Sequence, residues 1–158
     1  MENDRELIAL ISRYHQQVFA FAFYLLNDRD KAYEIAVSAF TEALGGPRLP
    51  AGGESAFVIR LYRITAAKCR AVKVIPRSDE ELERLFRGKA GSLLVVERAL
   101  QSLGFGEKRF LLLRDQARLP YAVIARITGT DAGAVKAETF RARGLLREKI
   151  ARLLENGT

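Results

Sequence analysis

Basic side chains concentrate near the C-terminal end of the sequence, at a spacing that suits contact with a nucleic acid. Within residues 132–154, Lys136, Ala137 and Arg141 fall on one side of an expected helix. Lys and Arg bind phosphate oxygens and read base edges, and the start of a helix also favours a phosphate. The candidates for such contacts are Gly133, Lys136, Ala137, Arg141, Arg143 and Arg147.

Two residues on the same helix do not fit a face that only binds phosphates. Glu138 carries a carboxylate, which repels phosphate unless it accepts a hydrogen bond from cytosine. Phe140 leans away from the apolar side of the helix. It could touch a thymine methyl, but a small hydrophobic contact with the first part of the chain is the better interpretation.

A second basic group lies in the middle of the chain. Residues 55–78 contain six basic side chains and no acidic one. On an expected helix over residues 54–75, Arg63, Arg70 and Lys73 lie opposite an apolar stripe, whereas Lys68 lies on the apolar side and reaches water at its rim. A cationic ridge of this kind suits a phosphate backbone. The candidates here are Arg60, Arg63, Arg70 and Lys73.

The apolar periodicity that positions these groups is helical throughout. The expected helices cover residues 5–26, 32–43, 54–75, 93–103, 107–117, 120–128 and 132–154, and a loop rich in glycine and proline covers 45–53. No strand is expected. The fold class is therefore all-α, with two small helical domains at residues 1–76 and 93–158. A flexible linker, residues 77–92, joins them and has room for a short helical turn around 82–86.

The last two expected helices have start and end residues typical of a helix-turn-helix. Pro120 suits the start of the first helix and Gly129 suits the left-handed position that ends it. Asp131 is then a good N-cap for the second, which buries the side bearing Val135 and Ala142. In this arrangement the second helix enters the major groove of DNA.

Composition excludes several other classes of protein. The chain has 158 residues, a net charge of +7 and 49% hydrophobic residues, which is an ordinary globular composition with a basic balance. With one cysteine, Cys69, and one histidine, His15, we expect no metal site, no cofactor and no enzymatic activity. The longest apolar run is too short to cross a bilayer, so we expect a cytoplasmic protein without membrane insertion.

Motifs in both halves resemble a bacterial RNA polymerase sigma factor of the small extracytoplasmic-function type. The segment Leu119-Pro120-Tyr121-Ala122-Val123-Ile124-Ala125, followed by Gly129, Gly133, Val135, Lys136 and Arg141-Ala142-Arg143, looks like region 4 of that family. Asn27-Asp28, Ala32, Glu34, Phe40, Phe57 and Leu61-Tyr62-Arg63-Ile64 are similar to region 2.

The resemblance implies a function and partners. Region 4 would read the −35 promoter element in the major groove. Region 2 would bind the polymerase clamp and melt the −10 element, with Asp30, Glu34 and Glu42 as the clamp contacts. The implied partners are the RNA polymerase core, duplex promoter DNA and an anti-sigma factor.

The chain departs from the family pattern at several positions. Arg60 and Ala67 stand where the family has a tryptophan and an asparagine. Where the family has an acidic pair and then a glutamine on the second helix, this chain has Tyr33 with Glu34 and then Val37. The aromatics left on the third helix are Phe57 and Tyr62. Two alternatives therefore stay open. One is a sigma-like interaction protein that has lost promoter melting and titrates an anti-sigma factor or regulator, and the other is a plain helix-turn-helix regulator.

Overall fold

The computed structural model describes residues 2–45, 51–74, 77–85 and 91–156, and every regular element in these ranges is a helix. The elements are α1 (Glu2–Leu26), α2 (Arg29–Leu44), α3 (Gly53–Ala71), α4 (Asp79–Leu85), α5 (Gly91–Gln101), α6 (Phe105–Leu111), the π-helix η1 (Leu112–Gln116), α7 (Tyr121–Thr128) and α8 (Ala132–Asn156). The all-α prediction is confirmed. Residues 46–50 of the expected loop and Phe86 of the expected turn lie outside the described residues.

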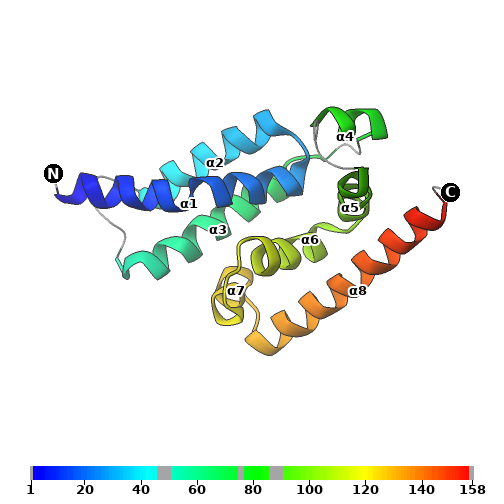
Figure 1. Cartoon of the computed structure of the whole chain (residues 1–158). Coiled ribbons are helices and arrows are strands. Elements are labelled where there is room, and N and C mark those ends of the chain that lie inside the picture. Colours follow the sequence, from blue (N-terminus) through cyan, green and yellow to red (C-terminus); the bar gives the residue numbers. More distant parts are fainter. Residues whose placement is uncertain (1, 46–50, 75–76, 86–90, 157–158) are drawn as a thin grey trace.

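The first three helices form an antiparallel bundle (Figure 1). Asp28 caps α2 by accepting a hydrogen bond from the backbone N–H of Lys31 at 3.0 Å, and Gly45, at φ 61°, ends that helix in the left-handed conformation. Phe21 and Leu61 are fully buried between the helices. The turn at residues 27–28 thus folds α2 back onto α1.

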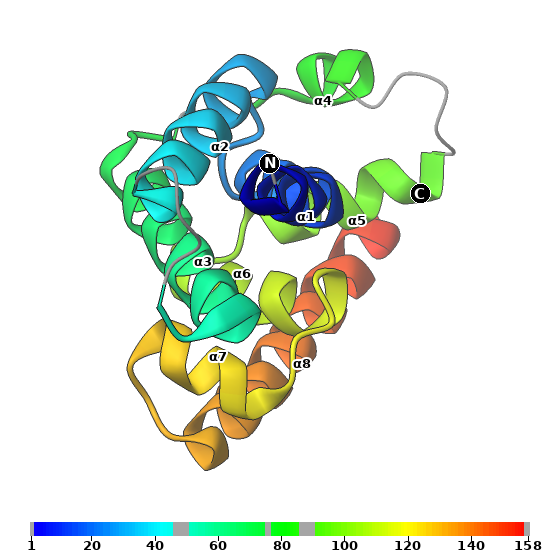
Figure 2. The same ribbon diagram turned by 90° about the vertical axis from the view of Figure 1, so that its left-hand side faces the viewer.

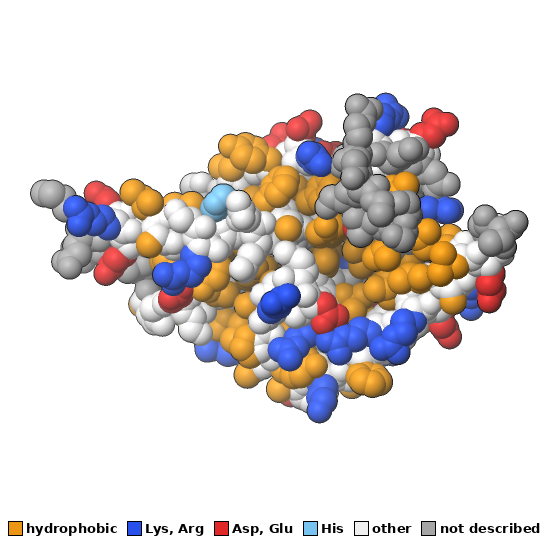
Figure 3. Space-filling model, in the orientation of Figure 1, with side chains coloured by type: hydrophobic (Ala, Val, Ile, Leu, Met, Phe, Trp, Pro, Cys, Tyr) orange, Lys and Arg blue, Asp and Glu red, His pale blue; other side chains and the backbone are white. Residues whose placement is uncertain are grey.

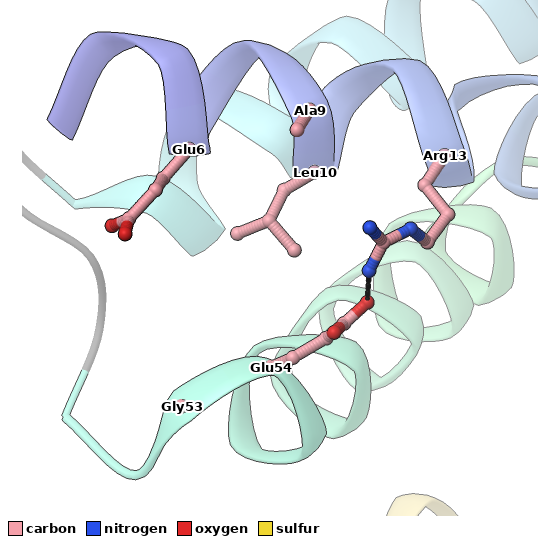
Figure 4. Close-up of a pocket in the computed structure, with 6 residues that line it drawn as sticks. All are labelled: Glu6, Ala9, Leu10, Arg13, Gly53 and Glu54. Atoms are coloured by element: carbon pink, nitrogen blue, oxygen red, sulfur yellow. Dashed lines mark hydrogen bonds and ion pairs between the residues drawn. The ribbon is translucent and has the colours of Figure 1, made fainter. Parts of the chain in front are cut away.

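A small polar cluster joins the N-terminal half of α1 to the start of α3 (Figure 4). The hydroxyl of Tyr14 donates to Glu54 at 2.7 Å, and Arg13 forms an ion pair with the same carboxylate. These two contacts lower the pKa of Glu54, the Tyr14 hydrogen bond contributing most. The cluster borders a cavity of about 220 Å³ that Leu10 also lines.

Helix α3 ends at Ala71, four residues before its expected end. Val72 adopts an extended conformation, with φ −86° and ψ 131°. Pro76 has no N–H to donate to the carbonyl of Val72 four residues earlier, and in a continued helix its ring would clash with that carbonyl, so the helix is disfavoured there. Lys73 therefore lies beyond α3 and not on it. Ile75, which was expected on the helix, lies outside the described residues.

The expected linker contains a short helix. Ser78 begins α4 by accepting a hydrogen bond from the backbone N–H of Glu81 at 3.3 Å, the arrangement of a Ser-x-x-Glu capping box. Arg77 pairs with Glu81 at 3.0 Å and donates to the carbonyl of Asn27 at 3.1 Å. Leu82 is 1% exposed and belongs to the main core. Residues 77–85 thus pack on the end of α1.

The expected helix over residues 107–117 divides into α6 and the π-helical turn η1. The backbone N–H of Ala117 donates to the carbonyl of Leu112 at 2.8 Å, five residues earlier. Apolar spacing alone could not predict this change, because one additional residue per turn leaves Phe110 and Leu113 still buried.

The larger of two hydrophobic clusters runs through both halves of the chain, and the smaller one, Leu103, Leu111 and Ala142, lies within the C-terminal half. The larger cluster contains Tyr62 and Phe21 of the first bundle together with Leu113, Ile124 and Val135 of the C-terminal half. Helix α3 contacts α7, and α1 contacts η1 and α6. Viewed along α1, α7 and α8 lie beneath α1 and α3, and α5 lies beside α1 (Figure 2). The structure is therefore closed, with the two halves packed together.

Candidate nucleic-acid interface

Helices α7 and α8 form the expected helix-turn-helix. Pro120 is the N-cap of α7, one position before its first residue, and Gly129, at φ 73°, ends it in the left-handed conformation. The Asp131 carboxylate then accepts a hydrogen bond from the backbone N–H of Ala134 at 2.8 Å, which starts α8. The three-residue turn holds the N-terminus of α8 at the protein surface.

Three buried side chains hold α8 against the rest of the fold. Val135, Thr139 and Ala142 are each 0% exposed. Thr139 was not anticipated, because its hydroxyl is polar, but it donates to the carbonyl of Val135 at 2.8 Å and is satisfied. Beyond Ala142 the helix is only half-buried at Leu146 and Ile150, since its C-terminal part extends past the core (Figure 1).

The opposite face of α8 carries the predicted contacts at the surface. Gly133, Lys136, Ala137, Arg141 and Arg147 are all exposed. Lys and Arg side chains gather along the N-terminal half of α8 in the space-filling view (Figure 3). The structure therefore brings five of the six residues predicted for this face onto one accessible strip.

Arg143, the sixth residue, has a different environment. Its guanidinium is half-buried and its Nε donates to Asp115 of η1 at 2.9 Å. This hydrogen bond raises the pKa of Arg143. Arg143 thus ties α8 to η1 as well as lying next to the exposed strip. Its partner could not be found from the sequence, because Asp115 is distant in sequence and lies on another element, η1.

Two acidic residues hold Arg141. Its guanidinium lies 2.9 Å from the carboxylate of Glu138 and 3.7 Å from that of Glu107. The Glu138 hydrogen bond is the largest cause of its raised pKa. Next to it on the helix, Phe140 is 69% exposed, so the expected hydrophobic contact of Phe140 with the first part of the chain is wrong for this structure.

The cationic residues of α3 are not all directed to open solvent. Arg63 donates a hydrogen bond to the carbonyl of Arg126 at the end of α7, and the guanidinium of Arg70 lies 5.1 Å from the ring centre of Phe105 on α6. The expected solvent-facing ridge is therefore partly covered by the C-terminal half. Arg60 is exposed and donates to the carbonyl of Glu42 at 3.3 Å.

Helix α2 presents an exposed face of mixed character. The acidic residues Asp30 and Glu34 are exposed. On the same helix the apolar side chains of Tyr33 and Val37 are also exposed, at 65% and 49%. Glu42, the third predicted clamp contact, pairs instead with Lys68 of α3 at 3.1 Å. This pair agrees with the prediction that Lys68 reaches the rim of the apolar side.

Neither aromatic residue left on α3 is available for stacking with a base in this structure. Phe57 and Tyr62 are both 0% exposed. Burial also raises the pKa of the Tyr62 hydroxyl and raises that of the Cys69 thiol to about 12. Both aromatic side chains therefore belong to the hydrophobic core of the first three helices.

Within the described ranges, no three His, Cys, Asp or Glu side chains are arranged to hold a metal ion. None of their helices is long and apolar enough to span a bilayer.

Together the capped turn, the anchored α8 and its basic exposed strip define a helix-turn-helix DNA-binding protein. Residues 93–146 match the family described as Sigma-70, region 4. The whole chain is also similar to the RNA polymerase sigma factor SigV of Bacillus subtilis (strain 168), with 28% identity over 152 residues that cover 92% of each chain. Residues 93–146 therefore contain a region of the Sigma-70, region 4 type, and the chain as a whole is similar to a sigma factor. Sigma factors are transcription initiation factors that bind RNA polymerase core and promoter DNA.

Proposed function

We propose that this protein is a sigma factor of the extracytoplasmic-function type and that it reads the −35 element with the exposed strip of α8. The observation that carries the proposal is the division of α8 into a buried side, at Val135 and Thr139, and an accessible basic side, at Lys136 and Arg141. A helix held in this way presents its first turns to a major groove, and its N-terminus favours a phosphate. Lys136 and Arg141 would contact base edges or phosphates. The small side chain of Ala137 would allow the helix to approach the DNA closely.

In the same proposal, Arg60, Arg63, Arg70 and Lys73 hold the −10 element, and Asp30, Glu34 and Glu42 contact the polymerase clamp. All seven side chains lie in the region 2-like half, and Asp30 and Glu34 are accessible on α2. The exposed Tyr33 supports a clamp contact on this face, because a large apolar side chain at the surface is often covered by a partner.

This assignment requires the two halves to separate. Elements at −35 and −10 are centred about 25 base pairs apart, which is roughly 85 Å of duplex. In the closed structure α3 contacts α7, so the two reading surfaces cannot span that length. We therefore place the domain boundaries at residues 1–76 and 93–158, with opening at residues 77–92. Fluorophores at Ser38→Cys and Ala151→Cys should move apart when core polymerase binds.

Reconstituted transcription tests the proposal directly. Core polymerase with this protein on a promoter library should give discrete start sites. Ala137→Glu, which puts a carboxylate on the exposed strip, should abolish them, while Ala151→Glu, an exposed alanine farther along the same helix, should not. Silence of the unaltered protein, or equal activity of the two variants, would refute it.

One observation favours a second candidate function. The partial covering of Arg63 and Arg70 and the burial of Tyr62 leave little on α3 to hold a melted strand. They support a sigma-like protein that binds an anti-sigma factor or regulator in place of a promoter. Co-purification of a small helical partner, together with no duplex affinity at moderate salt, would favour this candidate.

A further inference from the structure

Arg118 has an unusual backbone conformation in the turn that leads from η1 into α7. Its φ of 57° lies in the left-handed region. That region is unfavourable for a residue with a Cβ, and glycine is the residue that adopts it freely. The other described residue with positive φ that is not a glycine is Asn27, whose short amide side chain tolerates the conformation, whereas an arginine has no such feature. The chain therefore carries an arginine at a position where folding alone would favour glycine.

The turn is held in place on both sides of Arg118. The neighbouring residues Ala117 and Leu119 are both buried. The backbone N–H of Leu119 donates to the carbonyl of Leu113 at 3.0 Å, and the guanidinium of Arg114 donates to the carbonyl of Leu119, also at 3.0 Å. Arg118 itself is exposed, and no side chain or carbonyl among the described residues pairs with its guanidinium. The turn thus presents an unpaired cation to solvent.

This turn lies beside α8, at the edge of its basic strip. Asp115, three residues before Arg118, accepts a hydrogen bond from Arg143 of α8 at 2.9 Å. That contact is the main cause of the raised pKa of Arg143, and Tyr121, three residues after Arg118, adds to it. Lys136 is two helical turns before Arg143 and so occupies the same side of α8. The turn that carries Arg118 therefore flanks the strip on the side of Lys136.

A helix that enters a major groove has a phosphate backbone along each of its flanks. The groove is about 12 Å wide, and a helix with its side chains is roughly 10 to 12 Å across. Groups beside such a helix therefore meet phosphates and not base edges. Arg118 comes three residues before the first residue of α7, and in a helix-turn-helix the first helix crosses the backbone. A guanidinium in this place matches the charge and the geometry of a phosphate.

We propose that Arg118 binds a DNA phosphate on the strand that borders α8 in the major groove. This contact depends on the proposed function, because α8 must enter the groove for the phosphate to come within reach. It adds to the DNA interface a residue that lies outside the strip and outside both helices. It also accounts for an arginine at a position suited to glycine, since the guanidinium gains in DNA binding what the backbone loses in folding. Strained conformations are often retained at functional positions for such a reason.

Fluorescence anisotropy of the full chain with a labelled random-sequence duplex tests the contact. Arg118→Gln should weaken binding about threefold to tenfold at 50 mM salt and lower the log–log salt slope by about 0.9, the contribution of one phosphate. Arg118→Lys keeps the charge and should keep the slope. The matched control, Arg5→Gln, removes the same charge from an exposed position at the start of α1 and should leave the slope unchanged. Equal effects of Arg118→Gln and Arg5→Gln, or an unchanged slope in Arg118→Gln, would overturn the proposal.

Arg118→Gly separates a DNA contact from a structural role of the side chain. Glycine adopts the left-handed conformation freely, so this variant should raise the melting temperature by on the order of 1 to 3 °C. Its affinity for the duplex should nevertheless fall as in Arg118→Gln. An arginine needed only for folding would give the opposite pair of results, a lower melting temperature with an unchanged salt slope, and that outcome would overturn the proposal.

The effect of Arg118 should not depend on the sequence of the duplex. Phosphates carry no sequence information, so Arg118→Gln should weaken a random-sequence duplex and a promoter recovered from the library by a similar factor. A base contact would weaken the promoter more strongly than the random duplex. That difference would show that Arg118 reads a base and would overturn its assignment to a phosphate.

Ala137→Glu distinguishes failure of this contact from failure of the proposed function. On the same duplex it should weaken binding, because it places a carboxylate on the strip that enters the groove. Weaker binding by Ala137→Glu with no change in Arg118→Gln would overturn the contact at Arg118 and leave the proposed function standing. Unchanged binding by Ala137→Glu would refute the entry of α8 into the groove, and the Arg118 contact with it.

Discussion

Glu138→Gln should strengthen the binding of this protein to duplex DNA. In the structure the Glu138 carboxylate lies 2.9 Å from the guanidinium of Arg141, on the strip proposed to meet the major groove. The carboxylate both occupies Arg141 and repels phosphate. Glutamine has nearly the same shape without the charge, so the substitution frees Arg141 for a phosphate and adds one positive charge to the strip.

The size of the gain follows from the geometry of this pair. Exposed ion pairs are weak, so releasing Arg141 and removing the repulsion should tighten binding about fivefold at 50 mM salt. One additional neutralised phosphate steepens the salt dependence by about 0.9 in log–log slope. The advantage should therefore shrink about threefold to fourfold between 50 and 200 mM salt, to less than about twofold.

Fluorescence anisotropy with a labelled random-sequence duplex measures both quantities. The matched control is Glu148→Gln, which makes the same change of charge about 15 Å farther along α8, beyond the screening length in salt. Equal effects of the two variants would show that only net charge matters and would refute the placement of Glu138 on the strip. A loss of affinity confined to cytosine-containing sites would show instead that Glu138 reads that base.

Three further predictions concern the fold that holds the strip. Val135→Ala removes a fully buried side chain and should lower the free energy of unfolding by about 1 to 3 kcal/mol in urea titrations, and a change near zero would contradict the burial. Cys69, with a pKa of about 12, should be a thiolate in only about one molecule in 10⁴ at pH 8, so iodoacetamide should label it only after denaturation. Glu54 has a lowered pKa, so its contribution to stability is present above the unfolded value of about 4.3 and is lost as the pH falls through the folded value. Glu54→Gln should therefore reduce the loss of melting temperature between about pH 4.3 and more acidic solution, and identical acid profiles would contradict this.

The helix-turn-helix could be predicted because its determinants are local. Pro120, Gly129 and Asp131 each fix a helix end through the backbone conformation or hydrogen bond that their own chemistry favours. The structure has Gly129 and Asp131 where expected and Pro120 one position before its helix. The accessible side of α8 followed from the helical period, because Val135 and Ala142 had to be buried.

The environment of the basic residues could not be predicted in the same way. Arg63, Arg70 and Arg143 each bind a group distant in sequence, respectively the Arg126 carbonyl, the Phe105 ring and Asp115. Helical spacing says which side of a helix a residue occupies, but not which other helix covers that side. The π-helical turn added to this, because Asp115 lies in it and helical spacing did not predict the turn.

The closed junction between α3 and α7 also bears on how this protein balances folding against activity. In the proposed function, every contact that keeps the halves together, such as Arg63 with the Arg126 carbonyl, must be given up before both promoter elements can be reached. The measured affinity for a promoter is then the intrinsic affinity reduced by the fraction of molecules that are open. Substitutions that loosen this junction should lower the melting temperature of the free protein and yet increase transcription initiation from the promoter. Selection would then adjust this trade-off at the junction and not at the residues proposed to contact DNA.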